Sequence, residues 1–115
     1  SRPDSGVFEQ YLESHPGSID LWLGGHTHTH PDDTHGGKSH VETKWGGTHF
    51  INAACLSRYH GPENVPKSRL LTFEEGSNKV RVQCYMHSDE FLPQGWYERV
   101  ERTLELTRPF CREKP

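Results

Sequence analysis

The sequence has little apolar material. Only 30% of its 115 residues are hydrophobic and its mean hydropathy is −0.90, whereas typical domains carry roughly 45 to 50% apolar residues with glycine included. No apolar run approaches the roughly 20 residues that a membrane-spanning helix needs, and no signal-like segment opens the chain. Because so few apolar residues build only a thin core, we expect residues 1–115 to form a single partial domain.

An excess of one charge is lacking as well. The 13 basic and 16 acidic residues give a formal net charge of −3 and are interspersed rather than blocked, which leaves no electrostatic footprint for nucleic acid or for a membrane. Cysteine is scarce, since Cys55, Cys84 and Cys111 are odd in number and form no Cys-x-x-Cys pair. We therefore expect reduced, buried thiols and favour a cytoplasmic protein, because disulfides belong to oxidising compartments.

The first expected elements are a helix and a short strand. A helix is predicted over 4–14, with Asp4 or Ser5 as its cap and Pro16-Gly17 as its end. Its apolar stripe comprises Val7, Phe8, Tyr11 and Leu12. The apolar run 19–23 predicts a strand directly after it, which is half of an α/β unit.

The rest of the chain is mainly β in pattern. Residues 31–44 show no period and predict a loop, and the apolar run within 45–56 predicts a strand that is buried on both faces. The runs 69–74 and 79–86 flank a turn-like Glu-Gly-Ser-Asn and predict a hairpin. The second strand of the hairpin buries Val80, Val82, Cys84 and Met86. The tail predicts a turn or short helix and then an edge strand that ends before Pro109. The expected fold class is α/β.

The most informative stretch is 19–30, because it carries histidines at alternate positions. In an extended chain His26, His28 and His30 project from one side, and neutral imidazole is the commonest protein ligand for transition metals. A Gly-Gly pair precedes them and lets the backbone turn sharply at the end of the strand. Because sites in open α/β sheets lie beyond the carboxyl ends of strands, the stretch predicts a metal site.

Two further polar residues are candidates for a role near this site. Asn52 interrupts the apolar run of the second strand, and a buried amide must find hydrogen-bond partners, so it either fixes a neighbouring loop or faces the site. The first role is favoured. His60, followed by Gly61 and Pro62, stands at the far end of the same strand and is a candidate for contact with substrate. We group His30, Asn52 and His60 as candidate substrate-contacting or supporting residues.

The run Gly25-His26-Thr27-His28, at the end of an apolar strand, closely resembles the Gly-His-x-His motif of the calcineurin-like metallophosphoesterases. The order of elements around it is similar to the C-terminal half of that family's domain: a capped helix, the strand, a loop, a Gly-Gly-Thr-His-Phe-Ile-Asn-Ala-Ala strand, a hairpin and a closing strand. The resemblance implies an α/β/β/α sandwich with two divalent metal ions, such as manganese, iron or zinc, between its sheets. It implies that His26 binds one ion and His28 the other, and it gives His30 no fixed role.

Other motifs of the family are missing. The chain has no Gly-Asp pair and no Asn-His pair, so it lacks Gly-Asp-x-x-Asp and Gly-Asn-His-Asp/Glu, and no Asp-x-His precedes the histidine run. In the family these motifs supply the remaining ligands, the bridging carboxylate and a catalytic histidine. We therefore expect the chain to need the missing N-terminal half of the domain and to be inactive alone. The implied reaction of the intact protein is hydrolysis of a phosphoester by metal-activated water.

Two other classes fit part of the pattern. A non-enzymatic, histidine-rich metal-binding module would capture metal without chemistry. A small cupin-like β-barrel would bind a single metal through a His-x-His pair, but it expects a glutamate where Asp32 and Asp33 stand, and the N-terminal helix fits it poorly. Metal counting separates the classes, because the phosphoesterase holds two ions, the cupin one, and the module a weak and variable number.

Overall fold

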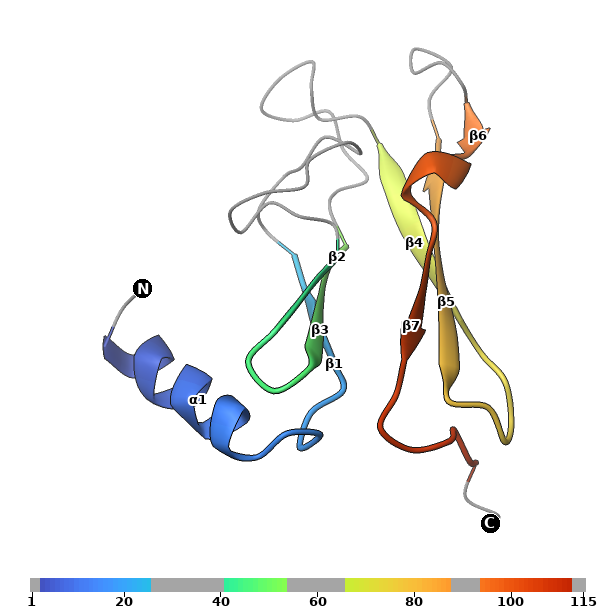
Figure 1. Cartoon of the computed structure of the whole chain (residues 1–115). Coiled ribbons are helices and arrows are strands. Elements are labelled where there is room, and N and C mark those ends of the chain that lie inside the picture. Colours follow the sequence, from blue (N-terminus) through green and yellow to red (C-terminus); the bar gives the residue numbers. More distant parts are fainter. Residues whose placement is uncertain (1–2, 26–40, 54–65, 88–93, 113–115) are drawn as a thin grey trace.

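The structure is a computed structural model that describes residues 3–25, 41–53, 66–87 and 94–112. Within them one helix, α1 (Pro3–Ser14), precedes all the strands (Figure 1). The strands are β1 (Leu21–Gly24), β2 (Val41–Lys44), β3 (Thr48–Asn52), β4 (Lys67–Phe73), β5 (Lys79–Met86), β6 (Gly95–Trp96) and β7 (Arg102–Glu105), and the 3₁₀-helix η1 (Glu98–Val100) precedes β7. One helix with mixed sheets is a small α/β fold, as predicted. No helix in the described ranges combines the length and the apolar character that crossing a membrane requires.

The first sheet has the strand order β1-β3-β2. β1 pairs in parallel with β3, so that Gly24 lies opposite Asn52, and β2 pairs antiparallel with β3. The carboxyl ends of β1 and β3 therefore lie together, at the upper end of the first sheet in Figure 1. A loop was predicted over residues 31–44, but its last four residues form the strand β2. Four residues are too few to show a period, and their pairing with β3 decides their conformation.

The turn between β2 and β3 corrects the start of the strand that was predicted over 45–56. Trp45, Gly46 and Gly47 all have positive φ, at 51°, 80° and 87°, so β3 begins only at Thr48. A Cβ at Gly46 would lie 2.2 Å from the carbonyl oxygen of Leu12, near the end of α1. The turn therefore packs directly against the helix, and only glycine allows this approach.

The second sheet is built on the predicted hairpin. β5 is its central strand, with β4 on one side and both β6 and β7 on the other. The predicted alternation along β5 is confirmed, because its inward-facing side chains are at most 1% exposed. These side chains are Val80, Val82, Cys84 and Met86. The tail is confirmed too, since η1 and then the short strand β7 come before Pro109.

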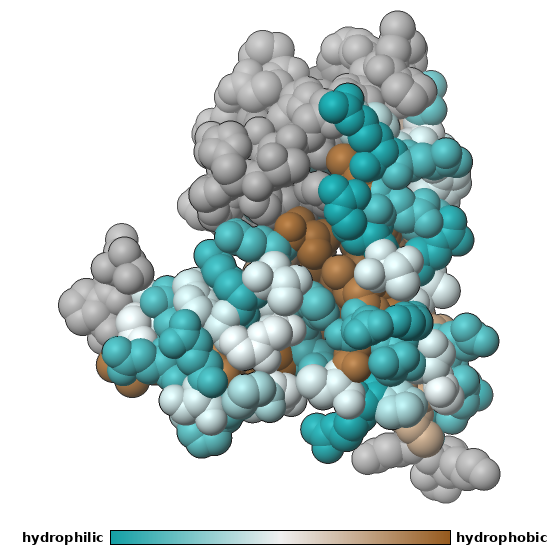
Figure 2. Space-filling model, in the orientation of Figure 1, coloured by the Kyte–Doolittle hydropathy of each residue, from teal (hydrophilic) through white to brown (hydrophobic). Residues whose placement is uncertain are grey.

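The two sheets pack face to face. Ile51 of β3 lies against Val80, Val82 and Leu104 of the second sheet. Leu21, Val41, Leu71 and Leu106 are partly buried and pack around this cluster. Figure 2 shows hydrophobic residues gathered at the centre of this face, where the two sheets meet. Burial of the cluster is the main apolar contribution that joins the sheets.

The helix covers little of the first sheet. Leu12 is 1% exposed, but Val7, Phe8 and Tyr11 are 71%, 36% and 52% exposed, so Leu12 is the one buried member of the predicted apolar stripe. Phe8 contacts Trp22 of β1, and the end of α1 packs against the turn at Gly46. Asp4 or Ser5 was predicted to cap the helix. The helix begins at Pro3, so both residues lie in its first turn instead. Proline suits this first position because it has no N–H to leave unpaired.

The turn at the end of α1 gives a matched test of packing. We expect Gly47→Ala to lower the free energy of unfolding by about 1 kcal/mol, because φ is positive but the space around Gly47 is open. Gly46→Ala should cost about 3 kcal/mol or more, because its Cβ also meets the Leu12 carbonyl oxygen. Urea titration of both variants measures the difference. Equal losses would contradict the close packing of this turn on α1.

Candidate functional site

The carboxyl ends of β1 and β3 define the candidate site. Gly24 ends β1, and its carbonyl oxygen accepts a hydrogen bond of 2.9 Å from the amide of Ala53, just past the end of β3. β4 begins at this same end of the molecule (Figure 1). His26 follows β1 by two residues in the sequence. The described backbone of β1 and Gly25 thus ends one residue before His26, the first predicted metal ligand.

The predicted histidines of the site lie outside the described residues. His26, His28, His30 and His60 all fall there, as do the polar residues of 31–40, so their geometry stays a prediction. Asp33-Thr34-His35 has the Asp-x-His spacing, but it follows Gly25-His26-Thr27-His28 in the chain, the reverse of the family's order. Within the described ranges no group of three or more histidine, cysteine or acidic side chains could hold a metal ion.

Asn52 is the one predicted site residue that the structure describes. It is half-buried at the end of β3, and its backbone carbonyl accepts a hydrogen bond of 3.1 Å from Nε of Arg69 in β4. This contact ties the first sheet to the second at the end where β1 finishes. Through its backbone, Asn52 therefore has a structural role beside the candidate site.

Two cations at this end were missed from the sequence. Lys67 is 1% exposed and lies opposite Met86, and Arg69 lies opposite Cys84, so both share the inward face of the hairpin. Burial lowers the pKa of Arg69 from its ordinary value. Strand alternation provides a signal that could have found them, because Lys67 and Arg69 take inward positions in line with Leu71. A charge at such a position is rare without a function or a partner.

The terminal nitrogens of Arg69 are unsatisfied. Nη1 and Nη2 are both buried, and neither has a hydrogen-bond partner in the part of the chain that the structure describes. Among the described residues this guanidinium is used through Nε alone, which donates to the backbone carbonyl of Asn52. Buried polar groups are nearly always hydrogen-bonded, and an exception calls for an explanation such as an ion or a water.

The cysteines follow the prediction in part. Cys84 is free and buried, and desolvation raises the pKa of its thiol, although the nearby charges of Arg69 and Lys67 act to lower it. Cys111 is free but exposed, which corrects the expectation of a buried thiol. It follows β7 in the tail, beyond the two sheets, where its Sγ contacts the Glu75 carboxylate. Cys55 lies outside the described residues.

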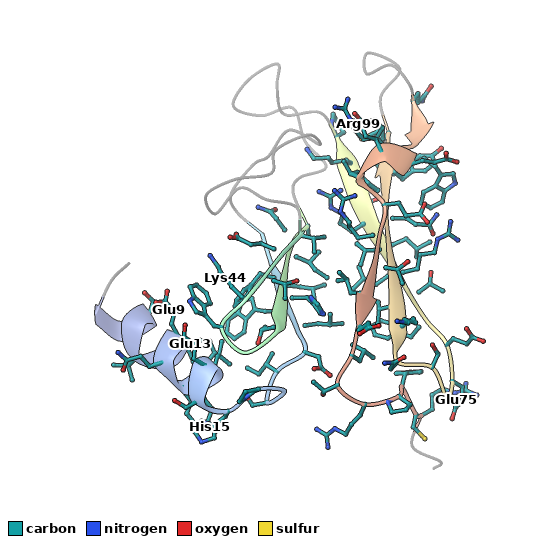
Figure 3. All side chains as sticks on the ribbon, viewed as in Figure 1. Glu9, Glu13, His15, Lys44, Glu75 and Arg99 are labelled. Carbon is teal, nitrogen blue, oxygen red and sulfur yellow. The ribbon has the colours of Figure 1, made fainter. Side chains whose placement is uncertain are left out.

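Charged side chains lie at both ends of the molecule. Figure 3 places Arg99, on η1, at the end where β1 and β3 finish, and Glu75 at the opposite end. Arg99 is exposed, and it adds a third cation to the end that holds Lys67 and Arg69. Glu75 is held by Arg112, whose Nε lies 3.1 Å from its carboxylate. Arg99 stands beside the exposed Glu98 on η1, so side chains of both signs lie at this end.

His49 has a structural position in β3. Its Nε2 lies 2.8 Å from the carbonyl oxygen of Glu105 in β7, and its Nδ1 lies 2.6 Å from the Thr43 hydroxyl. A carbonyl can only accept, so Nε2 donates to Glu105 and Nδ1 accepts from Thr43. The imidazole therefore links the two sheets and is used for structure.

Comparison with models of protein families, with curated proteins and with solved structures gives no match. The function is therefore inferred from the residues and their arrangement.

The two bonds of His49 predict a cost for its removal. His49→Leu should lower the free energy of unfolding by about 1 to 3 kcal/mol, because the Glu105 carbonyl and the Thr43 hydroxyl both lose a partner. His87→Leu is the control, since His87 is exposed and its ring has one hydrogen bond within the described residues, to Ser68 of the same sheet, and it should change stability by at most about 0.5 kcal/mol. Denaturant titration followed by tryptophan fluorescence measures both. Equal effects of the two substitutions would contradict the inter-sheet role of His49.

Proposed function

We propose that this chain is the C-terminal part of a binuclear metal-dependent phosphoesterase that hydrolyses a phosphoester by metal-activated water. One observation carries the proposal: β1 ends at Gly24 beside the end of the parallel strand β3, and Gly25-His26-Thr27-His28 follows immediately. A His-x-His pair at the carboxyl end of a parallel strand is the arrangement from which α/β enzymes build their sites.

The packing of the sheets supports the finer architecture of the proposal. A sheet with a parallel pair packs face to face on an antiparallel sheet, and α1 contacts the first of them. Phe8 of α1 contacts Trp22 of β1, with ring centroids 5.2 Å apart. These layers are compatible with part of an α/β/β/α sandwich, with the metal site at one end of the inter-sheet space.

The open edge of β1 supports a contribution from another segment. Among the described strands β1 pairs only with β3, and its side chains Trp22 and Leu23 are 44% and 55% exposed. A short apolar edge strand of this kind is a template for further strand pairing. We place the missing N-terminal half of the domain on this edge, where its strands would also cover the exposed apolar side of α1.

The residues of this chain have a defined part in the proposed site. His26 and His28 would each bind one ion through a neutral imidazole, while the bridging carboxylate and the remaining ligands come from the N-terminal half. Two bound divalent ions supply an activated water and neutralise charge on the phosphoryl oxygens.

The alternatives differ in how they fit. The cupin-like barrel fits poorly, because cupins are antiparallel and β1 pairs with β3 in parallel. A non-enzymatic metal-binding module remains the second candidate, since His26, His28 and His30 at alternate positions could capture metal without chemistry. Weak and variable metal occupancy in the intact protein would favour the module.

Metal binding by the chain tests the ligand assignment. We expect His26→Ala and His28→Ala each to weaken zinc binding, measured by equilibrium dialysis, by at least about tenfold, because loss of a mere supporting partner already costs about 10- to 100-fold. Binding should also weaken as pH falls through the imidazole range near about 6.5, because the ligand must be deprotonated. His15→Ala is the control, since His15 lies near the end of α1, away from the site. Unchanged binding in both site variants would overturn the assignment.

Phosphoesterase activity tests the proposed function itself. The chain alone should not hydrolyse a chromogenic phosphodiester, because it lacks the bridging carboxylate. A protein that joins it to the missing half should do so and should lose the activity with either His26→Ala or His28→Ala. Robust turnover by the chain alone, or full activity in both variants, would contradict the proposal.

A further inference from the structure

The buried cations of β4 suggest a second binding element at the same end of the molecule. Lys67 and Arg69 both face inward, at the start of β4 beside the ends of β1 and β3. Lys67 is 1% exposed, and Arg69 is half-buried. Neither residue belongs to the set that resembles metal ligands.

The guanidinium of Arg69 has an unused binding edge. Its Nε donates to the Asn52 carbonyl oxygen, which holds the side chain across the gap between β4 and β3. Nη1 and Nη2 are buried and have no partner within the described residues. Buried guanidinium nitrogens without hydrogen-bond partners lower stability. The presence of two such nitrogens on Arg69, in a chain with few apolar residues, therefore calls for a ligand.

We infer that Arg69 binds a tetrahedral oxyanion, the phosphoryl group of the substrate or product, through Nη1 and Nη2, with Lys67 adding positive charge behind it. The planar fork of a guanidinium matches two oxygens of a phosphoryl group. An anion that reaches these nitrogens gains hydrogen bonds without displacing a protein partner. The identity of the anion as a phosphoryl group rests on the proposed function, whereas the presence of an anion site rests on Arg69 itself.

Phosphate binding by the metal-free chain tests this inference. Isothermal titration calorimetry with inorganic phosphate, in the presence of a chelator and at low ionic strength, should show saturable binding at one site. Arg69→Met should weaken it by roughly 10- to 100-fold, because charge-assisted hydrogen bonds contribute about 1.5 to 3 kcal/mol. Arg112→Met is the matched control, since it removes the same charge from an exposed residue that pairs with Glu75 near the opposite end, and it should leave the affinity unchanged.

A second variant covers the case in which Arg69→Met does not fold. Arg69→Lys keeps a positive charge but loses the two-nitrogen fork, so it should also weaken phosphate binding, by less than Arg69→Met. Circular dichroism reports whether each variant is folded. Acetate, a planar carboxylate, should bind more weakly than phosphate to the unsubstituted chain.

The outcomes separate this inference from the proposed function. No saturable phosphate binding by the unsubstituted chain, unchanged affinity in the folded Arg69 variants, or acetate binding as tight as phosphate would overturn the phosphoryl site. Because the chelator removes metal, none of these results depends on His26 or His28. Loss of phosphate binding with Arg69→Met, together with zinc binding that is indifferent to both histidines, would leave the oxyanion site in place and refute the metallophosphoesterase.

Discussion

The structure depends on the burial of Ile51 between two sheets that share no strand. Ile51 is 2% exposed and is packed against Val80, Val82 and Leu104. Because it lies next to the last residue of β3, this contact fixes the end of β3, and through parallel pairing the end of β1, against the second sheet. Whatever follows β1 therefore starts from a fixed point over the inter-sheet space.

Hydrogen bonds also connect the two sheets on both sides of this apolar cluster. Arg69 reaches Asn52 at the end where β1 and β3 finish, and His49 reaches Glu105 further back along β3. Beyond His49, the carboxylate of Asp20 accepts two hydrogen bonds from Thr107. The backbone N–H lies 3.2 Å and the hydroxyl oxygen 3.1 Å from Oδ2 of Asp20. Of these links only Arg69 leaves buried nitrogens unsatisfied, and it is the link at the candidate site. The side chain of Arg69 thus links the two sheets through Nε and leaves Nη1 and Nη2 for a ligand.

Local patterns in the sequence predicted the elements that have a strong period. The alternation from Val80 to Met86 gave the hairpin and its buried face correctly, because one face of β5 packs and the other is wet. β2 was missed because four residues have no readable period, and its pairing with β3 decides it. The apolar stripe on α1 was predicted from its spacing, and Val7 and Tyr11 of that stripe are exposed. Periodicity shows that a helix has an apolar side but not what covers that side.

For the candidate site, the sequence predicted a strand end. The Gly-His-x-His motif after an apolar run indicated the carboxyl end of a strand, and β1 does end at Gly24. The neighbouring cation was not found, because the importance of Arg69 comes from strand register and from the carbonyl of a residue 17 positions away in the sequence. Asn52 was predicted to have a structural role through its side-chain amide, whereas the link to Arg69 runs through its backbone carbonyl and is a tertiary contact.

The central claim is that the end of β1 holds metal, and paramagnetic broadening by Mn²⁺ in the NMR spectrum of the chain tests it most directly. Unpaired electrons broaden nearby amide signals first, so the account predicts early loss of the signals of Gly24, Ala53 and Lys67. The signals of Gly76 and Leu106, which belong to the opposite end of the second sheet, should stay sharp. Broadening that begins at the opposite end, or that is uniform along the chain, would contradict the account.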